Sequence, residues 1–224
     1  MSRTKKLSTN IKTILTNINF RVIIFIVKPK HYFYLEVITM KKLNTFGKAI
    51  TKIFEVFHWI GAVGMAIAAI GIIIANNSVE NFKSLVAENF AREDLSVYGF
   101  QMGAPVVNGE LNVAAFIIFC IGAALLMVVV AMIFRNLHLI FKKSENSTPF
   151  QKDNVRMMRE IGIFAIAIPV IGFIMSVITR LVCGVDFAEI SIDMGGISMG
   201  IIVLCFSQFF AHGVELENDV DGLL

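Results

Sequence analysis

Apolar residues gather in four long runs that polar segments separate. The runs cover residues 56–75, 113–134, 161–179 and 194–211, and their sequences contain no Asp, Glu, Lys or Arg. As helices of about 1.5 Å per residue they would be about 27–33 Å long, and the hydrocarbon core of a bilayer is roughly 30 Å thick. The pattern therefore predicts an all-α membrane protein in which residues 40–224 form a four-transmembrane-helix bundle.

The segments between the runs carry weaker patterns. Residues 82–90 have apolar positions at helical spacing, and residues 95–102 have the pattern of a strand that leads into the turn Gly103-Ala104-Pro105. Residues 187–192 alternate between apolar and polar positions, which is the period of a strand. We expect these segments to form a small, β-hairpin-like extracytoplasmic loop cap that joins the two outer loops.

The third run is predicted to belong to a longer helix. Thr148, Pro149, Phe150 and Gln151 are the residue types of a capping box, with proline at the first helical position, where its missing N–H costs nothing. The helix should begin near Pro149 and continue to about Arg180, so that its first turns extend beyond the hydrocarbon core.

Lys and Arg residues concentrate in two of the connecting segments. The segment before the first run and the segment between the second and third runs are rich in them, whereas the other two loops have few. Because basic loops stay in the cytoplasm, both termini are predicted to be cytoplasmic. The basic residues that decide this orientation are Lys41, Lys42, Lys48, Lys52, Arg135, Lys142, Lys143, Lys152, Arg156 and Arg159.

Composition excludes several classes of protein. Charged residues make up 17% of the chain, against roughly 25% in soluble domains, and AVILMFWYC residues reach 56%. A water-soluble fold and a disordered chain are therefore excluded, and three cysteines are too few for a disulfide-rich miniprotein. Of the 20 basic and 17 acidic residues, seven basic and one acidic precede Met40. The remaining 13 basic and 16 acidic residues give no warrant for direct nucleic acid binding.

Residues 1–39 form a basic extension that cannot cross a bilayer. Its apolar run, residues 20–27, is interrupted at Arg21 and is shorter than the roughly 20 residues that a spanning helix needs. No signal-peptide cleavage site follows this run. Because Met40 precedes two lysines and an amphipathic lead into the first run, we expect translation to start at Met40 and the extension to be a mis-assigned start. The alternative is a disordered basic tail that lies on anionic lipid.

No catalytic, cofactor-binding or metal-binding residues are predicted, and we expect no enzyme activity. The sequence has no H-x-x-x-H, C-x-x-C or H-E-x-x-H spacing and no G-x-S-x-G nucleophile motif. Glu55 and His58 share a helix face at the inner end of the first run. We expect a solvated or snorkelling pair at the depth of the lipid headgroups, and the alternative is a proton site.

Two features of the runs concern helix packing. Gln208 is the strongly polar side chain of the fourth run, and we expect it to make an interhelical hydrogen bond within the membrane; the alternative places it on a substrate path. Gly196 and Gly200 form a G-x-x-x-G pattern, and Gly64 and Ala68 repeat the small-xxx-small spacing. These faces favour packing within the bundle over a specific homodimer, and a homo-oligomer is compatible with them.

The C-terminal half resembles a known family. The segment TPFQKDN at residues 148–154 and the ending FAHGVELENDVD at residues 210–221 resemble the bacterial membrane family called domain of unknown function 2975. The similarity covers about residues 40–224. It implies four transmembrane helices in a bacterial cytoplasmic membrane. Because members are often encoded beside a small helix-turn-helix regulator, it also implies a cytosolic DNA-binding partner.

Two functions follow as hypotheses. In the first, the chain is an interaction or regulatory protein in the lipid bilayer that acts with a cytosolic partner such as a helix-turn-helix transcription regulator. In the alternative, it is a subunit of a small oligomeric transporter or channel with Gln208 and Pro169 near the path. The surface predicted for the first function combines a basic helix start with an acidic tail: Lys152, Arg156, Arg159, Glu215, Asp219 and Asp221.

Overall fold

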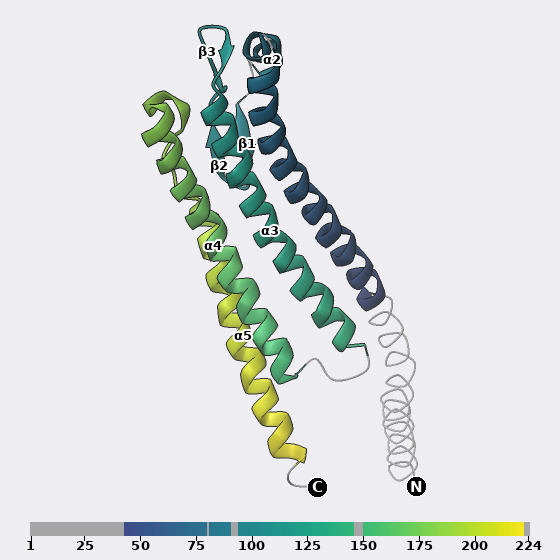
Figure 1. The fold of residues 1–224 in the computed structure, drawn as a ribbon. Coiled ribbons are helices and arrows are strands. Elements are labelled where there is room, and N and C mark those ends of the chain that lie inside the picture. The colour runs from purple at the N-terminus through teal and green to yellow at the C-terminus, as the bar shows by residue number, and fades with distance from the viewer. Residues whose placement is uncertain (1–42, 80, 91–93, 146–149, 222–224) are drawn as a thin grey trace, which may run out of the picture. The chain divides into compact units, whose positions relative to one another are not determined.

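The computed structural model describes residues 43–79, 81–90, 94–145 and 150–221 (Figure 1). Four helices in this part of the chain are long and apolar enough to cross a membrane. The fold is therefore all-α in its main elements and fits a multi-pass membrane protein, as predicted. The four helices are the N-terminal helix (Leu43–Ser78), α3 (Val113–Lys143), α4 (Lys152–Cys183) and α5 (Met194–Asp221).

Two compact units divide the chain, Met1–Phe46 and Gly47–Leu224. Of the first unit, the structure describes the helical residues Leu43–Phe46. The basic extension, residues 1–39, and both interpretations of it lie outside the described residues. All packing reported below is within Gly47–Leu224.

The short elements lie between the N-terminal helix and α3. The helix predicted at residues 82–90 is confirmed as α2, Phe82–Phe90. The strand predicted at residues 95–102 is instead a hairpin, because its two halves pair with each other in the register Leu95↔Met102. A second antiparallel hairpin follows it. The strands are β1 (Leu95–Val97), β2 (Phe100–Met102), β3 (Val106–Val107) and β4 (Glu110–Leu111).

Both hairpins turn on two residues with positive φ. Tyr98 and Gly99 have φ of 46° and 84°, and Asn108 and Gly109 have φ of 53° and 80°. These values are those of type I′ turns, whose twist matches that of the paired strands. Asn-Gly is the strongest short sequence signal for such a turn, and glycine takes this conformation without steric cost.

The strand predicted at residues 187–192 is wrong. The segment after α4 forms one 3₁₀ turn, Val185–Phe187, and then continues without regular structure to the start of α5. A backbone hydrogen bond, from the N–H of Gly103 to the carbonyl of Phe187 at 2.9 Å, joins it to the segment between the N-terminal helix and α3. Within the described ranges, the strands β1 to β4 pair only within their two hairpins, and neither hairpin forms a ladder with the segment after α4.

The predicted start of the third helix is also wrong by three residues. Helix α4 begins at Lys152, and Gln151 is its N-cap in an extended conformation with no side-chain capping bond. Phe150 lies outside the helix, and its ring fills the space that a Cβ on Gly213 would need. Packing of this aromatic ring against α5 therefore outweighs the local preference of the capping sequence.

The β1–β2 hairpin is inserted between α3 and α4. Phe100 is fully buried, and a Cβ on Gly122 of α3 would lie 2.9 Å from the edge of its ring. A Cβ on Gly172 of α4 would lie 3.5 Å from the backbone N of Phe100. Gly172 precedes the end of α4 at Cys183 by 11 residues, so the hairpin reaches about 17 Å along that helix. The buried core here comprises Phe100, Met102, Ala115, Phe119, Ala123, Leu126 and Met175.

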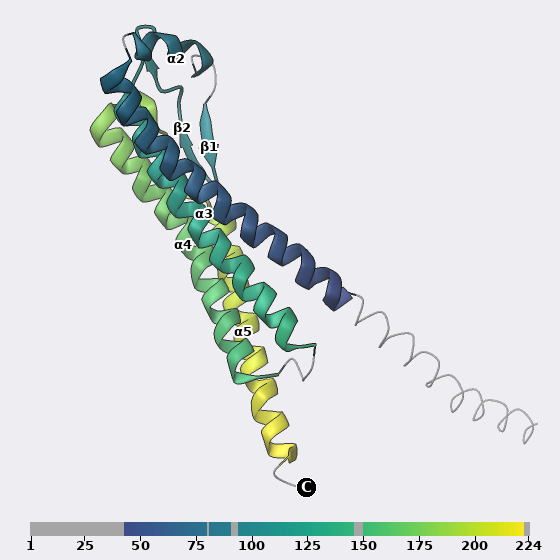
Figure 2. The same cartoon turned by 45° about the vertical axis from the view of Figure 1, so that its right-hand side comes forward.

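Helix α5 packs on the first half of α4 (Figures 1 and 2). At its start, a Cβ on Gly196 would lie 3.4 Å from the ring of Pro169, which is in the middle of α4. Further along, a Cβ on Gly200 would lie 2.9 Å from the carbonyl oxygen of Gly162. The G-x-x-x-G pattern thus serves the α4–α5 contact inside the chain. These contacts also set the stagger between the two helices: α5 begins level with the middle of α4 and not with the C-terminal end of α4.

Polar contacts tie the N-terminal helix, α3 and α4 together at the other end. The Asn136 amide donates to Glu160 at 2.9 Å, and Lys143 forms an ion pair with Asp153. Nδ1 of His138 lies 3.0 Å from the carbonyl oxygen of Lys48. We call this end, which holds Lys48, Asn136 and Asp153, the groove end, after the groove described below. We call the opposite end, where the β1–β2 hairpin lies, the hairpin end.

Candidate functional site

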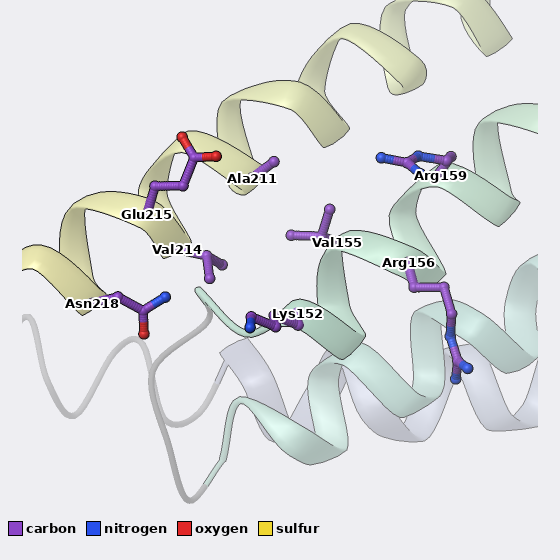
Figure 3. A pocket seen from close by; sticks show the side chains of 8 residues that line it. All are labelled: Lys152, Val155, Arg156, Arg159, Ala211, Val214, Glu215 and Asn218. Carbon is purple, nitrogen blue, oxygen red and sulfur yellow. The ribbon is translucent and has the colours of Figure 1, made fainter.

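A groove opens between the start of α4 and the end of α5. It has a volume of about 480 Å³, and both of its walls are helix faces (Figure 3). Lining positions recur at spacings of three and four residues on each helix, which places them in one row along one face. The lining residues are Lys152, Val155, Arg156 and Arg159 from α4 and Ala211, Val214, Glu215 and Asn218 from α5.

Cations dominate the α4 wall. In Figure 3, Lys152 and Arg159 extend toward α5, whereas Arg156 extends away from it. Nε of Arg156 lies 3.7 Å from a carboxylate oxygen of Glu160 on its own helix. The groove therefore receives positive charge from Lys152 and Arg159, and the N-terminal end of α4 adds its own positive potential.

The α5 wall supplies one carboxylate, that of Glu215, which contacts a histidine at the protein surface. Oε2 of Glu215 lies 3.1 Å from Nδ1 of His212, and both side chains are about three-quarters exposed. Exposed pairs of this kind contribute little energy, because water screens them. The balance of charge inside the groove is positive.

The floor of the groove is apolar. Val155 from α4 and Ala211 and Val214 from α5 lie between the charged side chains (Figure 3). Val214 is buried, and beside it the ring of Phe150 lies 5.6 Å from that of Phe210. The two helices are thus held together by aromatic and small residues below a charged rim.

The sequence-predicted interaction surface is brought together in part. Lys152, Arg156, Arg159 and Glu215 line the groove, and Asp219 is exposed one turn further along α5. Asp221 ends α5, and its side chain lies outside the described residues. Sequence reasoning missed the neutral lining residues Val155, Ala211, Val214 and Asn218. Their three- and four-residue spacing from the charged positions is the signal that could have identified them.

Gln208 does not make the expected interhelical hydrogen bond. Its side chain is exposed, and no hydrogen bond from its amide occurs among the described residues. The buried polar residue of α5 is its neighbour Ser207, whose hydroxyl donates to the carbonyl of Leu204 at 2.7 Å. The stagger also places Gln208 between Gly200, which is level with Gly162, and Gly213, which is level with Phe150. Gln208 is therefore near the charged first turns of α4, not deep in its apolar part.

The expectation of a solvated Glu55–His58 pair is wrong, because both side chains are buried within the protein. His58 places Nδ1 2.6 Å from the carbonyl oxygen of Phe54, and its Nε2 contacts the hydroxyl of Tyr98. Glu55 accepts from Lys52 at 3.0 Å. The tip of the β1–β2 hairpin covers His58, which no local pattern around His58 could indicate.

A second cavity, of about 550 Å³, lies at the hairpin end between β1, β2 and the segment after α4. Asp94, Asp186 and Glu189 line it, and all three are exposed. In the part of the chain that the structure describes, no group of three or more His, Cys, Asp or Glu side chains is placed to hold a metal ion. The cavity is polar and acidic, but its carboxylates do not converge on one point.

Comparison with known proteins finds no match: no family model, no curated protein and no solved structure matches the chain. The family resemblance described above therefore rests on its two motifs. The structure places these motifs against each other, since Phe150 of the first packs on Phe210 and Gly213 of the second.

Proposed function

We propose that the chain is a multi-pass protein of a bacterial cytoplasmic membrane that docks a soluble partner at its groove end, on the cytoplasmic side. Four helices of sufficient length and apolar character support the insertion, and the Lys and Arg residues of the segments at the groove end support the orientation.

The observation that carries the docking role is the exposed face of the last turns of α5. Leu216 and Val220 are 66% and 58% exposed, although they lie beyond the end of the apolar run at Ala211. The acidic residues Glu215 and Asp219 form the neighbouring row on the same helix. Apolar residues exposed to water beside carboxylates suit a partner that offers a hydrophobic patch rimmed by basic residues. A helix-turn-helix regulator, as the family resemblance implies, has such basic surface.

Co-purification tests the docking role. The protein is purified with the helix-turn-helix regulator that the family resemblance implies, and the retained regulator is quantified for the wild type and for Leu216→Ser/Val220→Ser. We expect at least a tenfold loss of regulator in the variant, because its apolar contact is removed. Val107→Ser, at an exposed apolar position at the hairpin end, is the control and should retain the regulator. Equal retention by all three proteins would contradict the proposal.

Orientation is tested by labelling single cysteines at Lys83 and Lys142 in intact cells, after the native cysteines are replaced. Lys83 lies on α2 and Lys142 on the last turn of α3. A membrane-impermeant reagent should label the Lys83 position alone. Labelling of both positions from the same side would contradict the proposed membrane orientation.

One observation favours a second function, a subunit of a small oligomeric transporter. The acidic cavity at the hairpin end lies beside the point where α5 begins, and a helix that starts at depth next to a polar cavity is typical of transport sites. Cation uptake into proteoliposomes that Asp186→Asn/Glu189→Gln abolishes would favour this function. Uptake equal to that of protein-free vesicles would exclude it.

A further inference from the structure

We propose that the groove between α4 and α5 binds the headgroup of an anionic phospholipid. The phosphate lies between Lys152 and Arg159, and the apolar part of the headgroup region lies on the floor formed by Val155, Ala211 and Val214. This inference rests on the membrane insertion proposed above. The groove adjoins the docking face, with Glu215 between them, but Leu216 and Val220 are not part of its lining.

The depth of the groove is that of lipid headgroups. On α4, the apolar run begins at Ile161, two residues after Arg159. On α5, the apolar run ends at Ala211, which is itself part of the groove wall. On each helix the lining residues lie at or just beyond the end of the apolar run, where spanning helices leave the hydrocarbon core. Because of the stagger, the α5 run ends level with the first turn of α4, so Arg159 is the deepest charged residue of the groove.

The chemistry of the lining matches an amphipathic anion. Arg and Lys side chains directed into the groove provide charge-assisted hydrogen bonds to a phosphate. The apolar floor of Val155, Ala211 and Val214 suits the glycerol carbons next to the phosphate. Basic pockets between membrane helices on the cytoplasmic side characteristically bind anionic headgroups.

The size of the groove favours a lipid over a protein segment. Its volume of about 480 Å³ is in the range of small-molecule sites, roughly 300–1,000 Å³. A docked helix is about 10 Å across with its side chains and needs a longer trough. The exposed apolar residues that a protein partner would bury, Leu216 and Val220, lie outside the lining.

Native mass spectrometry of the protein released from nanodiscs tests the proposal. The nanodiscs contain equal amounts of phosphatidylcholine and phosphatidylglycerol, and the retained lipids are counted. We expect wild-type protein to retain phosphatidylglycerol at least tenfold over phosphatidylcholine, and Lys152→Gln/Arg159→Gln to lose this preference. The matched control is Arg135→Gln/Lys142→Gln, which removes the same two charges from the exposed surface of α3 at the same end. Loss of the preference in both double variants would overturn the site in favour of a diffuse charge effect.

A second variant separates the shape of the groove from its charge. Ala211→Phe fills the apolar floor and leaves every cation in place. We expect it to lose phosphatidylglycerol to the same extent as Lys152→Gln/Arg159→Gln. Full retention in Ala211→Phe would overturn the groove as the binding place.

The outcomes distinguish this proposal from the proposed function. Failure of the protein to incorporate into nanodiscs contradicts membrane insertion itself. Incorporation with no preference for phosphatidylglycerol contradicts the lipid site alone. If Lys152→Gln/Arg159→Gln loses the regulator and keeps its phosphatidylglycerol, the groove takes a segment of the partner and the lipid proposal is wrong. Leu216→Ser/Val220→Ser should keep wild-type lipid retention.

Discussion

At the hairpin end, a β-hairpin fills the space between α3 and α4, whereas at the groove end the space between α4 and α5 is left open. Phe100 and Met102 of the hairpin are almost fully buried, and glycines on both helices make room for it. At the groove end, small and aromatic residues hold α4 and α5 together below exposed charges. The difference indicates that the hairpin end is built for stability and the groove end for binding, and the changes below test this separation.

Phe100→Ala should have the largest effect. The side chain is fully buried between α3 and α4, so its loss leaves a cavity that the helices cannot close, at a cost of about 3–5 kcal/mol. Thermal unfolding in detergent measures the loss. Val107→Ala, in the exposed second hairpin, is the control and should unfold near the wild-type temperature. Equal unfolding temperatures for the two variants would contradict a stabilising role of the hairpin end.

Gly200→Leu should come next. A side chain there meets the backbone of Gly162 and Ile166, so α5 must move away from α4, at a cost of about 1–3 kcal/mol. Gly64→Leu is the matched control, because open space surrounds a Cβ at Gly64. The same unfolding assay compares them, together with the lipid retention described above. A Gly200→Leu protein that retains lipid like the wild type would show that the groove does not depend on α4–α5 contact.

Tyr98→Phe should have a smaller effect, of about 1 kcal/mol, because it removes one hydrogen bond at the hairpin tip. The contact with His58 links the β1–β2 hairpin to the N-terminal helix. In a His58→Ala background the same change should therefore cost nothing further, which unfolding of the double variant measures. Additive losses would mean that the two side chains do not interact.

Asp153→Asn should have the smallest effect. The Lys143 ammonium donates to this exposed carboxylate and lowers its pKa from the ordinary 3.8. A carboxylate with a lowered pKa stabilises the folded state above its ordinary pKa, and the contribution disappears as the pH falls through the lowered value. Unfolding temperatures from about pH 6 to about pH 3 should fall less for Asp153→Asn than for the wild type. Lys143→Gln should give the same weaker dependence of unfolding temperature on pH. A pH dependence equal to that of the wild type in both variants would show that this pair does not stabilise the groove end.

Hydrophobic patterning predicted the four apolar helices and α2, because an uninterrupted apolar run and helical spacing are local properties of the sequence. It also identified the charged residues of the groove, since a basic helix start and an acidic tail are visible along the chain. The inserted hairpin was not predicted. Its burial depends on Gly122 and Gly172, which are distant from Phe100 in sequence, although Asn108-Gly109 was an available signal for the second turn.

The stagger of α5 relative to α4 likewise could not be predicted from the sequence. Its apolar run is about as long as the others, and nothing within a run records the depth at which a helix begins. The burial of His58 could not be predicted for the same reason, because Tyr98, which contacts it, is 40 residues away in the sequence. Contacts of this kind are decided by tertiary packing and not by local preference.

The connection between α4 and α5 acts as a spacer of fixed length. Residues 188–193 have no regular structure, and the segment is anchored where Gly103 bonds to Phe187 and where a carboxylate oxygen of Asp193 accepts from the N–H of Gly195. Extended chain covers about 3.3 Å per residue, so removing two residues would draw α5 about 7 Å toward the hairpin end. Ala211 and Val214 would then no longer face Val155. The residues that face each other across an opening at one end of the protein are thus set by the number of residues in a connection at the other.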